Sequence, residues 1–456
     1  MRLGLKFAMV FGMTLAILVP LLMIRGVIAE RQGYRNEVVR DIAANYGGRQ
    51  VLAGPVLVVP YEENEIAEVT GEDGVVRRSV RRKQRQWTFF PDRLQVQGDL
   101  VPDVRRRGLH EVRVYRWQGD SRARFDVRIP EDAAGLQRHI GRPWLGYDIA
   151  DVRGLVGTPA LALDGVATPV AQGLGHADGP GVHARLAAPS PGVKLAFEAR
   201  LALDLRGTEG FALLPLARDN RLQLRSRWPH PKFHGLSPRQ EVGAEGFRAD
   251  WTIASVASNA QRRYLQQPSL ALAPTPPGQA RVEVAQNWMP DDDTVGVTLI
   301  DPVNPYLQAD RASKYGLLFV ALTFIGFFMF ELVKQVRIHP IQYLLVGLAL
   351  AIFFLLLLSL SEHLAFGWSY LAAAAACIGL IAFYLASVLR SVARGIGFGT
   401  MLAVLYAALY GLLLSEDNAL ALGAGLLFLV LAAVMVATRK VDWYQVAARA
   451  PVAPRP

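Results

Sequence analysis

The sequence predicts a membrane protein with six transmembrane α-helices, one N-terminal and five C-terminal, and a large exported, mainly-β, sandwich-like domain between the first and the second. Two observations predict this class. Of the 456 residues, 52% are hydrophobic and the mean hydropathy is +0.23, whereas the 19% that are charged crowd into the middle of the chain. Apolar segments near the length of a spanning helix lie at both ends, and short alternating runs lie between them.

These patterns divide the chain into four parts. We predict an N-terminal membrane anchor helix at residues 1–29, an exported domain at 30–314, a five-helix transmembrane bundle at 315–438 and a cytoplasmic tail at 439–456.

The first apolar segment, residues 7–24, follows two basic residues and includes Pro20, which predicts a kink. Residues 27–29 loosely fit a cleavage site, but the apolar stretch exceeds the usual signal-peptide core, which favours an uncleaved anchor. Beyond it, the helical spacing of apolar and aromatic residues predicts a helix that continues well past the membrane and stops at two glycines: Tyr34, Val38, Ile42, Tyr46, then Gly47 and Gly48.

Five further apolar segments close the chain. Each is near the length that a helix needs to cross a hydrocarbon core of roughly 30 Å. They are residues 315–333, 341–360, 366–389, 398–414 and 419–438. His339 and Pro340 precede the second of these segments, and proline fits the first turn of a helix.

Lysine and arginine in the short loops predict the orientation, because positively charged loops stay on the cytoplasmic side. The loops after the second, fourth and sixth spans are basic, whereas the loops after the third and fifth contain no Lys or Arg. The residues that determine this topology are Lys334, Arg337, Arg390, Arg394, Arg439 and Lys440. We therefore expect a multi-pass protein of the cell inner membrane with both termini in the cytoplasm and residues 30–314 in the periplasm.

The exported segment holds 38 of the 49 Lys and Arg and 34 of the 39 Asp and Glu, a net charge of +4. This small excess does not favour nucleic acid as a partner. The predicted partners are the lipid bilayer and an envelope component or a membrane protein, and the sequence leaves the oligomeric state open. The basic run at residues 77–85 has two interpretations: contact with anionic lipid or lipopolysaccharide, or a solvated hairpin.

The exported domain is predicted to fold without a disulfide, because Cys377, the only cysteine, lies in the fourth span. Its strands are predicted from short alternating or β-branched runs separated by Gly, Pro and Asp. The runs are "VLAGPVLVVPY", "QWTFFPDRLQVQGDL", "HEVRVYRWQ", "RARFDVRIP", "KLAFEARLALDL" and "RVEVAQNW".

Two polar clusters end neighbouring helical hairpins on the predicted outer side, and they supply the candidate docking residues Glu362, His363, Glu416 and Asp417. Carboxylates beside an imidazole can bind a metal, relay protons or pair with the net-positive exported domain. The alternative is structural, because such residues also cap helices and occupy solvated turns at low cost. We predict a polar docking contact, and no catalytic residue, metal or cofactor.

Three other polar features carry weaker signals. Glu331, near the end of the second span, favours either a local pair with Lys334 or a proton relay. His230 and His234 are four residues apart, but the prolines around His230 argue against a helix, so a stiff loop is expected and not a zinc site. Residues 291–293 form an acidic turn without the ligand spacing of a calcium loop.

Four stretches of the membrane half are distinctive: "RASKYGLLFVALTFIGFFMFEL", "RIHPIQYLLVGLALAIFFLLLLSLSEHLAF", "LYAALYGLLLSEDNALALGAG" and "TRKVDWY". Two in the exported part accompany them: "YGGRQVLAGPVLVVPY" and "WPHPKFHG". Together they resemble the CreD family of bacterial inner-membrane proteins, also called cell envelope integrity proteins. The resemblance spans nearly the whole chain and is weakest over residues 62–182. It implies a role in envelope integrity, colicin tolerance and the response to cell-wall stress, without an established reaction.

The predicted function is therefore that of a non-enzymatic inner-membrane protein that supports the envelope through binding or docking by its periplasmic β-domain. The alternative is an intramembrane enzyme or a small-solute transporter that uses Glu362, His363, Glu416 and Asp417, which requires these side chains to line a shared cavity.

Overall fold

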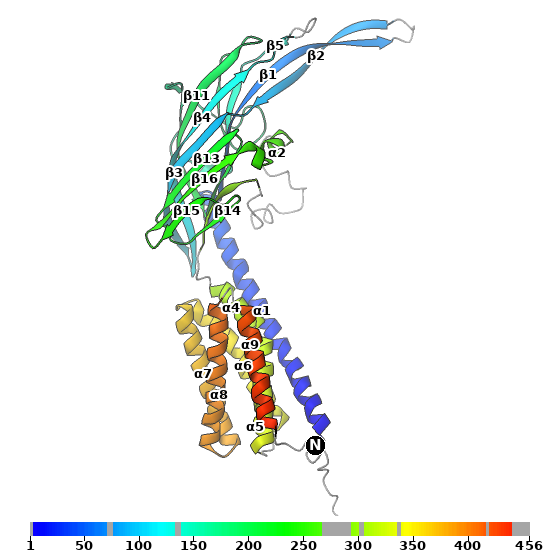
Figure 1. The fold of residues 1–456 in the computed structure, drawn as a ribbon, viewed down its shortest axis with the longest axis vertical. Helices are drawn as coiled ribbons and strands as arrows, with labels where there is room; N and C mark the ends of the chain where they lie inside the picture. The colour runs from blue at the N-terminus through cyan, green and yellow to red at the C-terminus, as the bar shows by residue number, and fades with distance from the viewer. Residues whose placement is uncertain are drawn as a thin grey trace, which may run out of the picture. The chain divides into compact units, whose positions relative to one another are not determined.

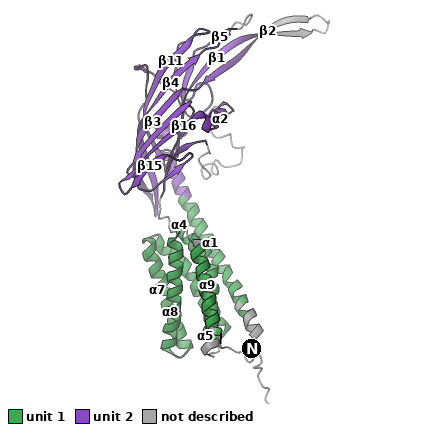
Figure 2. Cartoon of the chain, viewed as in Figure 1, with its two compact units in different colours: residues 1–35, 303–456 green, residues 36–302 purple. Residues whose placement is uncertain are grey.

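A computed structural model of the chain describes residues 3–70, 76–132, 138–266, 293–300, 305–334, 339–415 and 419–439. The chain forms two compact units, which Figure 2 colours separately. Residues 1–35 and 303–456 form the helical unit, and residues 36–302 form the β-unit. The structure thus contains an N-terminal apolar helix, a large mainly-β domain and several C-terminal apolar helices (Figure 1).

The first helix, α1 (Leu3–Tyr46), is 44 residues long and contributes to both units. It remains helical through Pro20 and ends before Gly47, whose φ of +108° suits glycine. The prediction that this helix continues past its apolar segment to the two glycines is confirmed.

The helical unit contains six further described helices. They are α4 (Pro305–Lys314), α5 (Gly316–Lys334), α6 (Pro340–Ser361), α7 (Phe366–Val388), α8 (Val392–Leu414) and α9 (Ala419–Thr438). All six predicted apolar segments coincide with helices, except for single end residues at 315 and 389, and α8 begins before the predicted residue 398. Arg394 is therefore in the first turn of α8 and not in the loop, because residues 389–391 are enough to reverse the chain.

Length and composition alone qualify α1, α6, α7 and α8 as helices that can cross a membrane. The pair α4 and α5 passes the same test only as one broken span, bent by 44°, and the described apolar part of α9, Ala421–Val436, is shorter. The sequence predicts six spans, whereas the described helices support four, or five with the bent pair.

The β-unit contains two sheets. The nine-stranded sheet follows the order β14-β17-β12-β1-β6-β10-β9, and β2 and β5 also pair with β1. Its strands are β1 (Gln50–Thr70), β2 (Val76–Phe89), β5 (Arg138–Ile140), β6 (Trp144–Ile149), β9 (Ala171–Gln172), β10 (Gly181–Arg185), β12 (Gly210–Leu214), β14 (Pro231–His234) and β17 (Val295–Leu299).

The eight-stranded sheet follows the order β15-β16-β13-β3-β4-β11-β7-β8. Its strands are β3 (Arg93–Arg107), β4 (His110–Arg128), β7 (Ala160–Leu163), β8 (Val166–Thr168), β11 (Lys194–Thr208), β13 (Asp219–Ser226), β15 (Arg239–Gly243) and β16 (Gly246–Ala254). The described pairings are antiparallel except for two, β1 with β12 and β13 with β3. Short helices at Val152–Gly154 (η1), Ser255–Ala257 (η2) and Ala260–Gln266 (α2) complete the described elements.

The two sheets pack face to face around one apolar core, which draws buried side chains from both. Trp117 of β4 stacks on Phe211 of β12 with ring centroids 4.7 Å apart, and Phe233 of β14 meets Phe247 of β16 at 5.5 Å. Alternation of buried and exposed residues along β3 and β11 is the pattern from which these strands are predicted, and β13, which was not predicted, shows the same alternation. The run at residues 281–288 lies outside the described part of the chain.

Strand β1 explains the longest apolar run of the exported segment. Leu52 and Leu57 face the core between the sheets, whereas Val56 and Val58 are buried on the opposite face against Tyr264 of α2. A strand that is covered on both faces needs a nearly continuous apolar sequence, and "VLAGPVLVV" supplies it.

Candidate functional site

Glu362 is the C-cap residue of α6, and its carboxylate joins three helices of the helical unit. The hydroxyl of Tyr306 on α4 donates to Glu362 Oε1 at 3.3 Å, and Arg31 Nε on α1 lies 3.8 Å from the same oxygen. The Glu362 side chain is only 10% exposed, so this contact is partly shielded from water. The first predicted docking residue therefore ties α1 and α4 to the end of α6.

The other predicted docking residues are not brought into this contact by the described structure. His363 is exposed, next to Glu362. Glu416 and Asp417 lie outside the described residues, as do the topology residues Arg337 and Lys440; the side chain of Lys334 is likewise not described. Docking through the four residues together stays a prediction.

Glu331 on α5 is buried, with 6% of its surface exposed, and accepts a hydrogen bond from the hydroxyl of Tyr343 on α6 at 3.0 Å. The Tyr343 ring packs against Phe324 and Phe327. This carboxylate thus joins two helices across an aromatic layer. A buried carboxylate among apolar helices is also where a proton relay would be placed.

His234 lies in β14 and not on a loop, because residues 231–234 extend the nine-stranded sheet beside β17, and His230 directly precedes that strand. His234 Nε2 lies 2.6 Å from Thr298 Oγ1. Burial lowers the pKa of His234, and the charges of Lys232 and Arg49 lower it further. A neutral, hydrogen-bonded ring in a sheet is a structural group.

Asp293 is the described residue of the acidic turn, and its carboxylate binds the start of α2. It accepts hydrogen bonds from the backbone N–H of Asn259 at 2.8 Å and from Arg263 at 3.2 Å. An anionic group at a helix N-terminus is stabilising. Among the described residues, no group of three or more His, Cys, Asp or Glu is placed to hold a metal ion.

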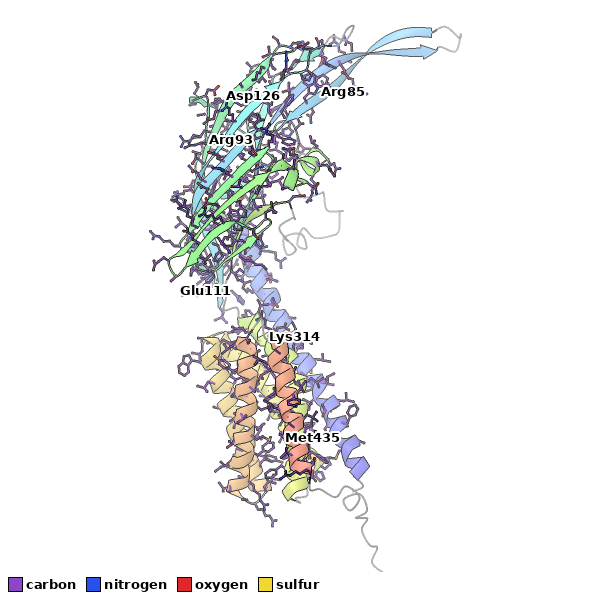
Figure 3. The ribbon with its side chains drawn as sticks, viewed as in Figure 1. Arg85, Arg93, Glu111, Asp126, Lys314 and Met435 are labelled. Atoms are coloured by element: carbon purple, nitrogen blue, oxygen red, sulfur yellow. The ribbon has the colours of Figure 1, made fainter. Side chains whose placement is uncertain are left out.

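The basic run at residues 77–85 belongs to β2, which forms a long hairpin with β1. The register sets basic positions opposite acidic ones, with Glu63 across from Lys83, Glu65 across from Arg81 and Glu68 across from Arg78. Arg85, labelled in Figure 3, pairs with Glu63 at 2.6 Å. The basic run therefore lies in a hairpin, as the second interpretation predicts. Contact of this run with anionic lipid or lipopolysaccharide stays a prediction.

The end of α1 is fixed in the β-unit by a set of polar contacts that we name the junction site: Gly47, Gly48, Gln50, Asp151, Arg153 and Thr208. Backbone and side-chain bonds hold both glycines, since Gly48 N–H donates to Asp151 Oδ2 at 2.9 Å and Thr208 Oγ1 donates to the Gly47 carbonyl at 3.0 Å. The buried Gln50 amide donates to the carbonyls of Asp151 and Arg206 at 3.0 and 2.9 Å. The last turn of α1 is thereby joined to η1 and β11.

Electrostatics strengthen the junction site. Burial raises the pKa of Asp151, but hydrogen bonds from the Arg153 side chain and from the backbone of Gly48 and Arg153 outweigh this effect, so the pKa lies below its usual value. Arg153 also donates to the Ala44 carbonyl of α1 at 3.3 Å. The ionised carboxylate therefore supports one of the helix-end contacts directly and another through Arg153.

Beside this site lies a depression of ≈ 610 Å³, the arginine pocket, lined by Asp41, Ile42, Asn45, Tyr46, Arg105, Arg106, Arg107, Arg116 and Arg206. Most of its arginines contact other side chains of the protein. Arg107 pairs with Asp41 at 2.6 Å, and Arg105 and Arg206 lie over the Tyr46 ring at 5.5 and 5.4 Å. This pocket holds α1 by cation–π contacts and an ion pair.

Arg116 in the same pocket makes a two-pronged contact with Asp204, with Nε 2.7 and 2.8 Å from the two carboxylate oxygens. The hydrogen bond from Arg116 is the main reason that the pKa of Asp204 lies below its usual value. Sequence reasoning missed the junction site and the pocket. The available signals were Tyr46 at the end of the helical spacing and the run of arginines at residues 105–107.

Comparison with known proteins covers nearly the whole chain. The model of a protein family described as inner membrane protein CreD matches residues 2–444. The chain is 33% identical over 443 residues to the inner membrane protein CreD of Escherichia coli (strain K12), a match that covers 96% of this chain and 93% of that protein.

Proposed function

The chain belongs to the CreD family of inner-membrane proteins, and from this premise we propose that it supports cell envelope integrity without catalysing a reaction. In this proposal the β-unit lies in the periplasm and binds an envelope component or a partner protein, while the apolar helices hold it at the inner membrane. Tolerance to envelope stress and to colicins would follow from that binding.

One observation carries the proposal. A single helix, α1, is packed by apolar side chains in the helical unit and is fixed by the junction site in the β-unit. A membrane anchor that enters the β-unit without a linker suits a protein whose work is to hold a folded domain at a membrane.

The proposed topology places both termini in the cytoplasm and is tested by labelling single cysteines after Cys377 is replaced by alanine. Asp103→Cys, in the exposed part of β3, should react with a membrane-impermeant maleimide in intact cells, whereas Arg394→Cys should react only after the membrane is opened. External labelling at position 394 would overturn the topology.

The binding role is tested by crosslinking in living cells from photoreactive residues on the exposed faces of the β-unit. We expect a discrete envelope component to be captured, and its capture to fall together with envelope protection when those faces are altered. Loss of protection without any change in capture would contradict the proposal.

The alternative of a transporter or an intramembrane enzyme is predicted for Glu362, His363, Glu416 and Asp417, two of which lie outside the described residues. Among the described residues it is tested best at the buried Glu331, the predicted relay position. Replacing Glu331 with Gln preserves the size of the side chain and removes its charge and its titration. If transport or hydrolysis is measured with the purified wild type and disappears in this variant, the alternative replaces the proposed function.

A further inference from the structure

The outer face of the eight-stranded sheet is covered by polar side chains. Successive residues of a strand point to opposite faces, so the exposed residues of β3, β4, β11, β13 and β16 share one surface. In Figure 3, Arg93 on β3 and Asp126 on β4 are labelled on this sheet. Its described exposed positions carry mostly arginine, glutamine, aspartate and glutamate, together with Lys194, Thr252, Val101 and three alanines, and no aromatic residue.

The register of the strands brings like charges together on this face. Five antiparallel pairs place two cations directly opposite each other: Arg93 with Arg124, Arg122 with Arg200, Arg116 with Arg206, Arg128 with Lys194, and Arg225 with Arg248. Side chains opposite each other in an antiparallel sheet are about 4.5–5.5 Å apart at Cβ, and like charges there are destabilising. Acids of the same sheet compensate part of this repulsion: Asp120 pairs with Arg122 and Arg200, Asp204 with Arg116, and Asp126 with Lys194. The compensation is incomplete, because Arg93 and Arg124 make no ion pair within the described residues.

Four of these arginines and Arg221 of β13 form what we name the arginine patch: Arg93, Arg122, Arg124, Arg200 and Arg221. They occupy neighbouring exposed positions on four adjacent strands, with Gln95 in register between Arg221 and Arg122. Asp120 is the acid in contact with the patch, 2.9 Å from Arg122 and 3.5 Å from Arg200. Within the described part of the chain, Arg93, Arg124 and Arg221 make no side-chain hydrogen bond or ion pair.

The choice of arginine indicates the ligand. Residues 30–314 contain 34 arginines and four lysines. A guanidinium group binds phosphate through two parallel hydrogen bonds, which an ammonium group cannot do. A phosphate monoester carries about −1.5 to −2 charges, so one such group can neutralise two opposed arginines, whereas one carboxylate cannot.

The neighbouring side chains indicate what carries the phosphate. Exposed glutamines accompany the patch at positions 95, 97, 118 and 223. One depression on the same face is lined by three of them, together with Asp99, Asp120 and Arg225. Amides both donate and accept hydrogen bonds, which matches the hydroxyl groups of sugars. The described exposed positions of these five strands carry no aromatic residue on which a nucleobase would stack, and their apolar residues are single ones, Val101 and the alanines at 196, 202 and 254, too few and too scattered for an acyl chain.

We propose that the outer face of the eight-stranded sheet binds a phosphorylated glycan, with the phosphate groups held by the arginine patch. This inference rests on the proposed function and names its ligand class. In the part of the chain that the structure describes, Arg93, Arg124 and Arg221 make no ion pair, and these are the cations of the patch that a phosphate group would neutralise.

The test measures binding of the full-length protein, purified in a neutral detergent at about 0.15 M salt, to a phosphorylated oligosaccharide made by removing the acyl chains from lipopolysaccharide. The same oligosaccharide after phosphatase treatment is the first control. We expect the phosphorylated form to bind and the dephosphorylated form to bind at least about tenfold more weakly, as expected for the loss of a charge-assisted hydrogen bond.

The decisive variant is R93Q/R124Q, because neither arginine makes an ion pair among the described residues, although the register sets Asp219 opposite Arg93 and Glu198 opposite Arg124. We expect its affinity to fall about tenfold or more while its melting temperature stays equal or rises, since a repulsive pair is removed. R93K/R124K keeps the charges and should lose part of the affinity. R142Q/R262Q removes two exposed arginines outside this sheet and should bind like the wild type.

Equal binding of the two oligosaccharides, or wild-type affinity in R93Q/R124Q, would overturn the inference. Binding through the same arginines to vesicles of equal parts phosphatidylcholine and phosphatidylglycerol, without binding of the oligosaccharide, would overturn it in favour of a membrane surface. If the oligosaccharide fails to bind while crosslinking from the β-unit still captures another envelope component, the glycan proposal fails and the proposed function stands.

Discussion

The two ends of α1 are held by different forces. In the helical unit, Ile17, Leu21, Ile24 and Ile28 are buried among apolar side chains of the neighbouring helices. In the β-unit, the last turns are held by hydrogen bonds, an ion pair and cation–π contacts at the junction site and the arginine pocket.

The difference follows from the surroundings of each end, which are lipid for the apolar end and water for the polar end. Apolar packing between helices remains effective in lipid when small residues let the backbones come close, as Gly347 does beside Ile17. In water the same helix exposes polar groups at its end, which must be paired. In the helical unit α1 is therefore held by apolar packing, and in the β-unit it is held by polar contacts. Variants at each end measure the two contributions separately.

The largest effect is expected at the polar end. Gly47→Val places a side chain at a φ of +108°, where its Cβ would lie 2.9 Å from the carbonyl oxygen of Arg206 and from the Cα of Gly154. We expect the free energy of unfolding of the β-unit to fall by about 3 kcal/mol or more, measured by circular dichroism during denaturation. Gly33→Val, on the same helix in open space, should leave it nearly unchanged.

At the apolar end, Gly347→Ile should separate α6 from α1, because a Cβ there would lie 2.7 Å from Ile17 and 2.8 Å from Phe324. The expected loss is about 1–3 kcal/mol, as for overpacking elsewhere, measured as a lower melting temperature in detergent. Gly379→Ile is the matched control, since nothing lies within 4 Å of its Cβ position. Equal losses in both variants would show that close approach of α6 and α1 is not required.

A smaller effect is expected where the helical unit uses charge. Glu362→Gln removes the ion pair with Arg31 and keeps an acceptor for Tyr306, so the cost should be about 0.5–1 kcal/mol. His363→Gln, at the exposed neighbour, should cost less. If the Glu362 variant loses envelope protection while its melting temperature is unchanged, the residue serves docking, as the sequence predicts.

The smallest effect is a pH dependence at the junction site. The pKa of Asp151 is lower in the folded protein than the value of about 3.9 for an unfolded chain. Its contribution is therefore fully present above about pH 4 and is lost as the pH falls through the lower, folded value. Stability of the wild type should decline in that range, and Asp151→Asn should flatten the decline. An identical pH profile in the variant would contradict this assignment.

Sequence patterns predicted the helices, their ends and a strand, because these features depend on residues that are close in the sequence. The apolar helices, the end of α1 at two glycines and the start of α6 at Pro340 follow from length, spacing and capping; His339 indeed accepts from the Ile341 N–H and Gln342 completes the cap. The strand at β1 was predicted for the same reason, since its apolar run is long and bounded.

Contacts between distant residues were not predictable in this way. Glu362 meets Arg31 and Tyr306 because helices pack side by side, and no periodicity specifies which faces meet. The opposed arginines become visible only when the register of β3 and β4 is known, because each strand alone shows ordinary alternation of buried and charged residues.

The parallel pairing of β1 with β12 has a consequence for how the protein is made. Gly47 bonds to Thr208, 161 residues later, so at the usual synthesis rate of about 5–20 residues per second this contact waits on the order of ten seconds. Meanwhile β1, an apolar central strand, is already synthesised, and such segments aggregate when they stay unpaired. Strand β2 follows directly and covers one edge of β1 from Leu57 to Thr70. The hairpin therefore covers only the later part of β1 early, and residues 50–56 remain unpaired until β6 and β12 have been synthesised.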